Sequence, residues 1–192
     1  MKKILKRILS LVIVCGILFS VENSAMAAEP AEESPKITEY TNVLEGEEGI
    51  KRIAEIYNIS YGEAEAKYND LRAGVDRLEE RYIQQDVGMG YIIEVGCLVQ
   101  VQCGVGHCNY VVVNSTWSNV ISSGNATWEQ FYAYATIEGT LKDTLRFQAR
   151  GNLVVTASQS LSSGFSAAGF TIGGSTGTTC YYRKTVSINQ TL

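Results

Sequence analysis

The 192-residue sequence contains one histidine, His107, and this scarcity narrows the catalytic chemistry open to the chain. A serine or cysteine nucleophile activated by a histidine base would have to use this residue. Its neighbours are glycines and the cysteines Cys103 and Cys108, which we expect to be bridged, so no free thiol lies beside it. We therefore interpret His107 as a turn residue and predict no catalytic residues of this kind.

Carboxylates are also scarce in the second half of the chain. Residues 87–192 contain only four of them: Glu94, Glu129, Glu138 and Asp143. A glycosidase would have to take its acid and base from this set, and the sequence shows no pairing among them. We predict that the protein is not an enzyme and uses no cofactor, with a small hydrolase as the weakest alternative.

The sequence has one long apolar run, residues 8–21, and none later. At 14 residues it is shorter than the roughly 20 that a membrane-spanning helix requires. Basic residues precede it and Ala25-Met26-Ala27 follows it, which is the order of regions in a secretory signal peptide. We predict that residues 1–27 are a signal peptide and that the mature protein is secreted and extracellular.

Removal of the signal peptide would leave a chain poor in basic residues, with 12 Lys and Arg against 19 Asp and Glu. This net charge, near −7, argues against nucleic acid as a partner. The acidic residues are unevenly distributed. Residues 28–86 contain 15 acidic and 7 basic residues, whereas residues 87–192 contain 4 acidic and 5 basic residues. The shift, together with a change from helical to strand periodicity, predicts a boundary near Val87.

Residues 28–86 are expected to form an acidic segment in two parts. The first part, residues 28–46, begins with a Glu-rich stretch that contains both prolines, and it is interpreted as a flexible leader. The second part, residues 47–86, is predicted to be helical, with a short first helix that ends near Asn58. Its charge suits the segment to solubilising or masking the rest of the chain.

A second helix is predicted from the residues that follow. Ser60 and Glu63 have the spacing of a capping box, which places the helix start at Tyr61. Apolar residues then recur at heptad spacing as far as Tyr82, and Gly74 weakens the middle of the run by about 1 kcal/mol relative to Ala. The stripe indicates a helix that packs against its own sheet or the first helix, with a coiled coil as the alternative.

Residues 88–192 alternate apolar and polar residues and are predicted to form strands. Residues 91–103 and 110–113 are expected to pair as a hairpin around a Gly-rich turn. Residues 129–189 are interpreted as a meander of five segments, with one hairpin turn at Gly151-Asn152. The predicted fold class is therefore α+β, mainly β: an antiparallel β-sandwich or flattened barrel preceded by a short helical pair.

Four cysteines remain after the signal peptide, Cys97, Cys103, Cys108 and Cys180, and an even number in an exported chain favours disulfides. The predicted hairpin places Cys103 opposite Cys108, which leaves Cys97 for Cys180. Cys97 and Cys103 would lie roughly 20 Å apart on one strand, whereas bridged Cα atoms lie within about 7 Å. A metal site is the alternative, but the spacing matches no zinc pattern, so we predict no bound metal.

Trp117, Trp128, Tyr132 and Tyr134 give the strand region a set of large aromatic side chains. If they are exposed together, they could stack on sugar rings or lie at a protein or membrane interface. If they are buried, they are ordinary core residues. We take them as candidate ligand or interface residues.

These observations favour an exported, non-catalytic β-domain that binds a cell surface, a glycan or a protein partner. The alternative is a membrane-active toxin or bacteriocin-like protein that uses an amphipathic β-hairpin over residues 153–172, with the acidic helical segment as a masking or pro-region. Residues 153–161 and 165–172 would be the two arms of that hairpin. The sequence indicates no oligomeric state.

Overall fold

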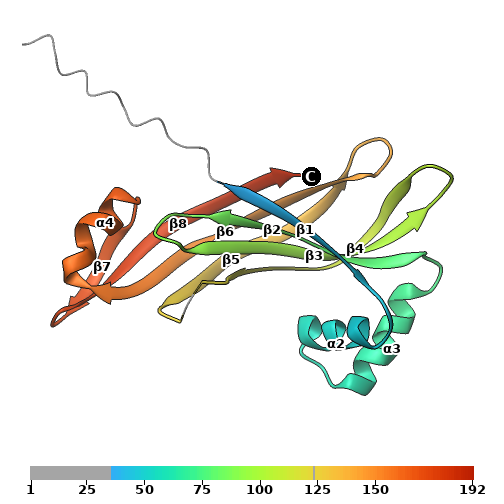
Figure 1. Cartoon of the computed structure of the whole chain (residues 1–192), viewed down its shortest axis with the longest axis horizontal. Helices are drawn as coiled ribbons and strands as arrows, with labels where there is room; N and C mark the ends of the chain where they lie inside the picture. The colour runs from blue at the N-terminus through green and yellow to red at the C-terminus, as the bar shows by residue number, and fades with distance from the viewer. Residues whose placement is uncertain (1–35, 123) are drawn as a thin grey trace, which may run out of the picture. The chain divides into compact units, whose positions relative to one another are not determined.

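The strands pair into two antiparallel sheets of four strands each (Figure 1). The computed structural model describes residues 36–122 and 124–192. The elements in chain order are β1 (Ile37–Leu44), α2 (Gly46–Tyr57), α3 (Tyr61–Arg72), β2 (Arg77–Asp86), β3 (Ile92–Cys103), β4 (Cys108–Val120), β5 (Ala126–Glu138), β6 (Thr144–Ser158), a 3-10 helix η1 (Gln159–Leu161), α4 (Ser162–Ala167), β7 (Thr171–Thr176) and β8 (Thr179–Thr191). Sheet A has the order β1-β2-β3-β4, and sheet B has the order β5-β6-β8-β7.

The inner faces of the two sheets share one hydrophobic core. Strand alternation turns Ile83 and Val95 of sheet A inward, together with Phe147, Leu153 and Tyr182 of sheet B, and all five are fully buried. Burying a large side chain of this kind stabilises a fold by roughly 1.5–3 kcal/mol. Because residues of both sheets belong to a single cluster, the sheets pack face to face as a β-sandwich, and the predicted fold class is confirmed.

Helices α2 and α3 cover part of the outer face of sheet A. Ile53 of α2 and Tyr68 of α3 meet Leu78 and Leu98 of the sheet in a second apolar cluster. α2 ends at Tyr57, and the next residue, Asn58, has a left-handed backbone (φ 50°) and donates its N–H to carbonyls of the last helical turn. The predicted end of the first helix near Asn58 is therefore confirmed.

The start of α3 is fixed by the predicted capping box. The Ser60 hydroxyl accepts a hydrogen bond from the Glu63 N–H, and the Glu63 carboxylate accepts one from the Ser60 N–H at 3.0 Å. The helix is shorter than predicted, however, because it ends at Arg72 and Gly74 then adopts a left-handed backbone (φ 77°). The prediction of a helix through Tyr82 is wrong.

Residues 77–86 form strand β2 in place of the predicted helical turns. β2 buries side chains on both of its faces, since Leu78 packs under the helices while Ile83 points into the shared core. Such a strand shows little alternation in its sequence, and its apolar residues fell by chance at helical spacing. The change from helix to strand therefore comes at residues 73–76 rather than at Val87.

Part of the predicted leader is also a strand. β1 pairs with β2 from Ile37 opposite Gln85 to Leu44 opposite Leu78, so the prediction of flexible backbone is wrong for residues 37–44. β1 is an edge strand with mostly exposed side chains, and backbone hydrogen bonds to β2 rather than burial hold it in place. The predicted signal peptide and the start of the leader lie outside the described residues.

Sheet B departs from the predicted meander of five segments. β6 runs unbroken through Gly151-Asn152, so the hairpin turn predicted there is wrong. A glycine is needed at position 151 for packing, because a Cβ would lie 2.6 Å from the Glu129 carbonyl oxygen and 2.6 Å from the Trp128 ring. β8 then pairs with both β6 and β7, which puts the last strand of the sequence inside the sheet.

The amphipathic hairpin predicted over residues 153–172 does not form. Residues 153–158 are the end of β6, after which η1 and α4 precede β7. Leu153 is fully buried in the shared core, and Phe165 of α4 stacks on Tyr182 with ring centroids 4.2 Å apart. Packing of Phe165 against the core accounts for a short helix where the sequence suggested a turn.

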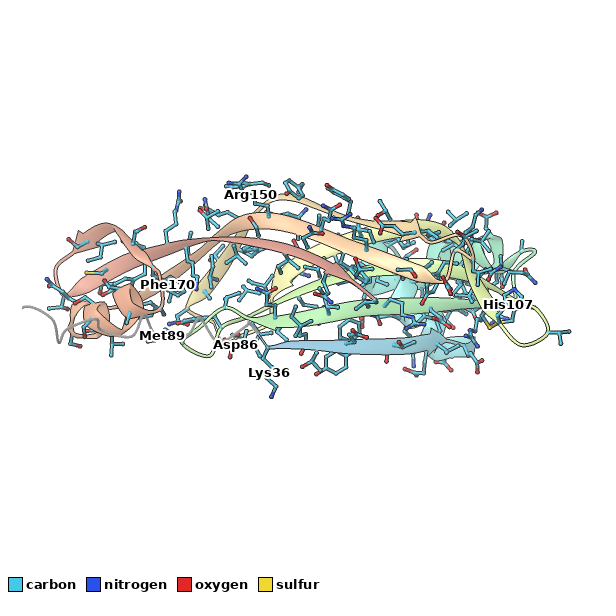
Figure 2. The ribbon with its side chains drawn as sticks, turned by 90° about the horizontal axis from the view of Figure 1, so that it is seen from above. Lys36, Asp86, Met89, His107, Arg150 and Phe170 are labelled. Atoms are coloured by element: carbon cyan, nitrogen blue, oxygen red, sulfur yellow. A yellow bond between two sulfur atoms is a disulfide. The ribbon has the colours of Figure 1, made fainter. Side chains whose placement is uncertain are left out.

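One of the two predicted disulfides is present. Cys103 and Cys108 are bridged across the β3–β4 hairpin, and His107 lies in its exposed turn as predicted (Figure 2). Cys97 and Cys180 are free thiols buried in the shared core, so the predicted bridge between them is wrong. The Cys97–Cys180 pairing was predicted only because these two cysteines remained once Cys103 was paired with Cys108. A buried cysteine can also pack as a small apolar residue without a disulfide partner.

A lysine connects the two sheets at the end of the sandwich opposite His107, where Figure 2 labels Met89 and Phe170. Lys184 Nζ donates to the Val87 carbonyl at 2.6 Å and to the Ala168 carbonyl at 2.7 Å. Burial lowers the pKa of this ammonium group. The β2–β3 turn of sheet A is thereby held against the segment that follows α4 in sheet B.

Candidate binding groove on sheet A

An aromatic row crosses the outer face of sheet A beside α2. The strand register aligns Tyr40, Tyr82, Gly96 and Trp117 across β1 to β4. The rings of Tyr40 and Tyr82 stack with centroids 4.8 Å apart. Glycine at position 96 leaves room for the Trp117 ring that lies across it, since a Cβ would be 2.5 Å from the ring in its present position. The row therefore presents flat ring surfaces next to the helices.

Glu80 lies two residues along β2 from Tyr82, on the same face, and is almost fully buried, with 2% of its surface exposed. Arg52 of α2 donates from Nε and Nη2 to Glu80 Oε1, with Nε at 3.0 Å, and Asn42 Nδ2 donates to Oε2 at 3.1 Å. The hydrogen bond to Glu80 raises the pKa of Arg52, so the guanidinium stays charged. This ion pair neutralises the buried carboxylate and fixes α2 against β2.

Glu94 lies on the other side of the aromatic row and is half-buried on β3. Its carboxylate accepts hydrogen bonds from Gln84 Nε2 at 3.0 Å and from Trp117 Nε1 at 3.4 Å. Within residues 36–122 and 124–192, no cationic side chain forms a salt bridge with it. Neutral donors thus hold Glu94 in position while its negative charge stays uncompensated.

Two adjoining hollows follow α2 over this face, with volumes of about 610 and 340 Å³, and both are lined by Arg52 and Glu94. We call them together the α2 groove. Tyr82 and Trp117 supply ring surfaces to it, and Arg52 is the one lysine or arginine among its lining residues. The carboxylates that line it are Glu45, Glu48, Glu55, Glu80 and Glu94. Rings combined with an excess of carboxylates suit a positively charged group.

The four aromatic residues singled out in the sequence do not share one surface. Trp117 lines the α2 groove, whereas Trp128 points into the sandwich, where its Nε1 donates to Ser118 Oγ at 2.7 Å. Tyr132 and Tyr134 are exposed on the outer face of sheet B. A β-bulge just before Tyr132 separates them, because its extra residue turns Trp128 and Tyr132 to opposite faces despite their even spacing.

Sequence reasoning did not identify Arg52 and Glu80 as site residues. Both belong to the region interpreted as one helical segment, in which charged residues are expected on the solvated side. A strand interpretation of residues 77–86 would have placed Glu80 and Tyr82 on one face. The two-residue spacing of Glu80 and Tyr82 is therefore the sequence feature that could have indicated this site, although the heptad spacing of the apolar residues obscured it.

No protein-family model, curated protein or solved structure matches the chain. In the part of the chain that the structure describes, no three Asp, Glu, His or Cys side chains converge as metal ligands. None of the helices described there is long and apolar enough to cross a bilayer. The chemistry of the α2 groove is therefore inferred from its own geometry.

Proposed function

We propose that this protein is an exported, non-catalytic binding protein that holds a cationic side chain of a protein partner in the α2 groove. The observation that carries the proposal is the uncompensated carboxylate of Glu94 beside the Trp117 ring. A lysine or arginine side chain placed here would meet a negative charge and an aromatic face together. A cation–π contact contributes about 0.5–2 kcal/mol, with larger values as the site is desolvated.

The rest of the groove supports the same ligand chemistry. The one guanidinium in its lining, Arg52, is already bound to Glu80 and Glu55, so its charge is offset. Glu45 extends the negative surface at the start of α2, whereas Glu48 is paired with Lys51 at 2.9 Å. Carboxylates around a binding site attract a basic partner and raise its association rate, with a strong dependence on salt.

Two features support export. Residues 1–27 have the basic, apolar and small-residue regions of a secretory signal peptide, in that order. The Cys103–Cys108 disulfide is of a kind that persists in oxidising compartments. A secreted binding protein would meet its partner outside the cytoplasm.

The test is a calorimetric titration of the mature protein with an arginine-rich peptide, with a glutamate-rich peptide of equal length as the negative ligand. Glu94→Gln keeps the side-chain shape but removes the charge, and we expect it to weaken binding of the basic peptide about tenfold. Glu129→Gln, the same change on the outer face of sheet B, is the matched control and should bind like the wild-type protein. Equal affinities in the wild-type protein and Glu94→Gln would refute the proposal.

A further inference from the structure

The outer face of sheet B carries a second exposed aromatic patch. Tyr132 and Tyr134 of β5 are 41% and 42% exposed, and their ring centroids lie 5.4 Å apart. Phe131, at the bulge beside them, is 58% exposed. Neighbouring aromatic side chains left in water on the face of a sheet are typical of a binding surface.

The patch lies beside a guanidinium group that has no ionic partner in the described residues. The strand register places Arg150 opposite Tyr132 and Gln148 opposite Tyr134. Figure 2 shows Arg150 on the side of sheet B that faces away from sheet A. Its side chain can therefore reach a ligand that lies on the two tyrosine rings.

The other two arginines of this face differ from Arg150. Arg146 is paired with Glu138 at 3.4 Å, and Arg183 is paired with Glu129 at 3.0 Å. Their charges are offset by these carboxylates. Among the described arginines of this face, Arg150 is the one whose positive charge is not paired with a carboxylate.

The same face continues into a hollow of about 370 Å³ between β6, β8 and β7. Tyr181, which lines it, is 44% exposed, and Arg183 lines it as well. Tyr181 pairs with Thr156, which is six residues along β6 from Arg150, or ~20 Å at the rise of a strand. Aromatic rings and guanidinium groups therefore occur at two places on this face: Tyr132, Tyr134 and Arg150 at one, and Tyr181 and Arg183 at the other. We call the open surface that contains both places the strip.

We propose that this strip binds an anionic polysaccharide, with a sugar carboxylate on Arg150 and sugar rings on Tyr132 and Tyr134. A guanidinium donates two parallel hydrogen bonds to a carboxylate, and the Gln148 amide can donate to and accept from sugar hydroxyls. The C–H faces of sugar rings pack on exposed aromatic rings. An open strip with repeated features suits a polymer of repeating units, whereas a small ligand requires a more enclosed pocket. The surface is separate from the α2 groove, and the inference does not rest on the function proposed for that groove.

The test compares three soluble polymers by affinity electrophoresis of the mature protein. Polygalacturonate has sugar rings and carboxylates, dextran has sugar rings without charge, and polyglutamate has carboxylates without sugar rings. We expect binding to polygalacturonate, weakened about tenfold by Arg150→Gln and by the double change Tyr132→Ala with Tyr134→Ala. Lys36→Gln removes a positive charge from an exposed residue on the sheet A side of the molecule, away from Arg150 (Figure 2), and this control should bind polygalacturonate like the wild-type protein. Circular dichroism verifies that each variant is folded.

Each contrary result points to a different occupant. Equal binding of polyglutamate and polygalacturonate would overturn the assignment to sugar, because charge alone would explain it. Equal binding of dextran, unaffected by Arg150→Gln, would overturn the role of the carboxylate. Absence of binding to polygalacturonate would overturn the proposal as a whole. Self-association in sedimentation analysis that Arg150→Gln abolishes would assign the strip to a second copy of the chain.

Discussion

The two sheets of the sandwich place their charged residues differently. In sheet A, the adjacent residues Glu79 and Glu80 point to opposite faces of β2, and they are only 1% and 2% exposed. Glu79 is paired with Arg77 and Arg81, and Glu80 is paired with Arg52. The carboxylates of Glu79 and Glu80 are thus buried in the fold, where they are paired with arginines from the same half of the chain.

In sheet B, the ion pairs lie at the surface. Arg183 and Glu129 expose 49% and 44% of their side chains, and Arg146 and Glu138 expose 37% and 39%. Water already solvates these groups, so each pair adds little stability. The comparison shows that the paired carboxylates of β2 are enclosed by the fold, whereas the ion pairs of sheet B remain in contact with water.

The largest expected effect is the loss of stability when the buried ion pair of sheet A loses its cation. The same change in an exposed ion pair of sheet B is the comparison. Arg52→Met leaves the Glu80 carboxylate buried without its cation, and we expect the free energy of unfolding to fall by about 3 kcal/mol. Arg183→Met breaks an exposed pair with Glu129 and should cost less than about 1 kcal/mol. Urea unfolding of both variants measures the difference. Equal losses would show that the two sheets do not differ in this way.

A smaller effect is expected at the two glycines that lie under tryptophan rings. A Cβ at Gly151 would lie 2.6 Å from the Glu129 carbonyl oxygen, and a backbone atom cannot easily move, so we expect Gly151→Ala to cost about 2 kcal/mol. At Gly96 the close atoms all belong to the Trp117 side chain, which can rotate away, and Gly96→Ala should cost about 1 kcal/mol. Urea unfolding gives both values, and tryptophan fluorescence should show Trp117 displaced in Gly96→Ala. The reverse order of costs would contradict this explanation.

The smallest effect is a dependence of stability on alkaline pH. Burial raises the pKa of the Cys97 thiol in sheet A from 9.0 to about 12, with Glu80 adding to the shift and Arg81 opposing it. Between these values the unfolded chain loses a proton that the folded chain keeps, so this group's contribution to stability falls as pH rises, by about 1.4 kcal/mol at pH 10. Urea unfolding of the wild-type protein and Cys97→Ala between pH 8 and 10 should show a steeper decline in the wild-type protein. Parallel curves would mean that Cys97 does not contribute.

Features that depend on neighbouring residues were predictable from the sequence. The capping box of Ser60 and Glu63 starts α3 as expected, because both partners lie within one helical turn. The Cys103–Cys108 bridge was also predictable, because a short turn leaves its two ends little choice of partner. In both cases the decisive contacts are close in sequence.

Features that depend on distant residues were not predictable in the same way. Gly151 has the sequence of a turn residue, but its place in β6 is set by Trp128 of the neighbouring strand. Residues 77–86 lack the alternation of a half-exposed strand because the helices cover one face of β2 while the shared core covers the other. A single sequence does not show which distant side chain will cover a given face.

The candidate site was predictable only in part. Trp117, Tyr132 and Tyr134 were identified by residue type, since large aromatic side chains are natural ligand contacts. The sequence pattern did not predict that Trp117 lies on the other sheet, nor the bulge in β5 that turns Trp128 away from Tyr132 and Tyr134. The pairing of Arg52 with Glu80 was not predictable, because it requires α2 to lie on a strand 28 residues away in sequence.

The position of β8 between β6 and β7 sets an order of events during folding. The strands of sheet A follow one another in sequence and in space, so this sheet can pair as soon as residues 37–120 are available. Sheet B is different, because its edge strand β7 has no partner until residues 179–191 arrive to fill the gap beside β6. Until then, β6 exposes an unpaired edge and the shared core lacks Tyr182 and Ile188. Completion of the sandwich therefore waits for the final strand, and loss of that strand would leave β7 detached and remove Cys180, Tyr182, Val186 and Ile188 from the shared core.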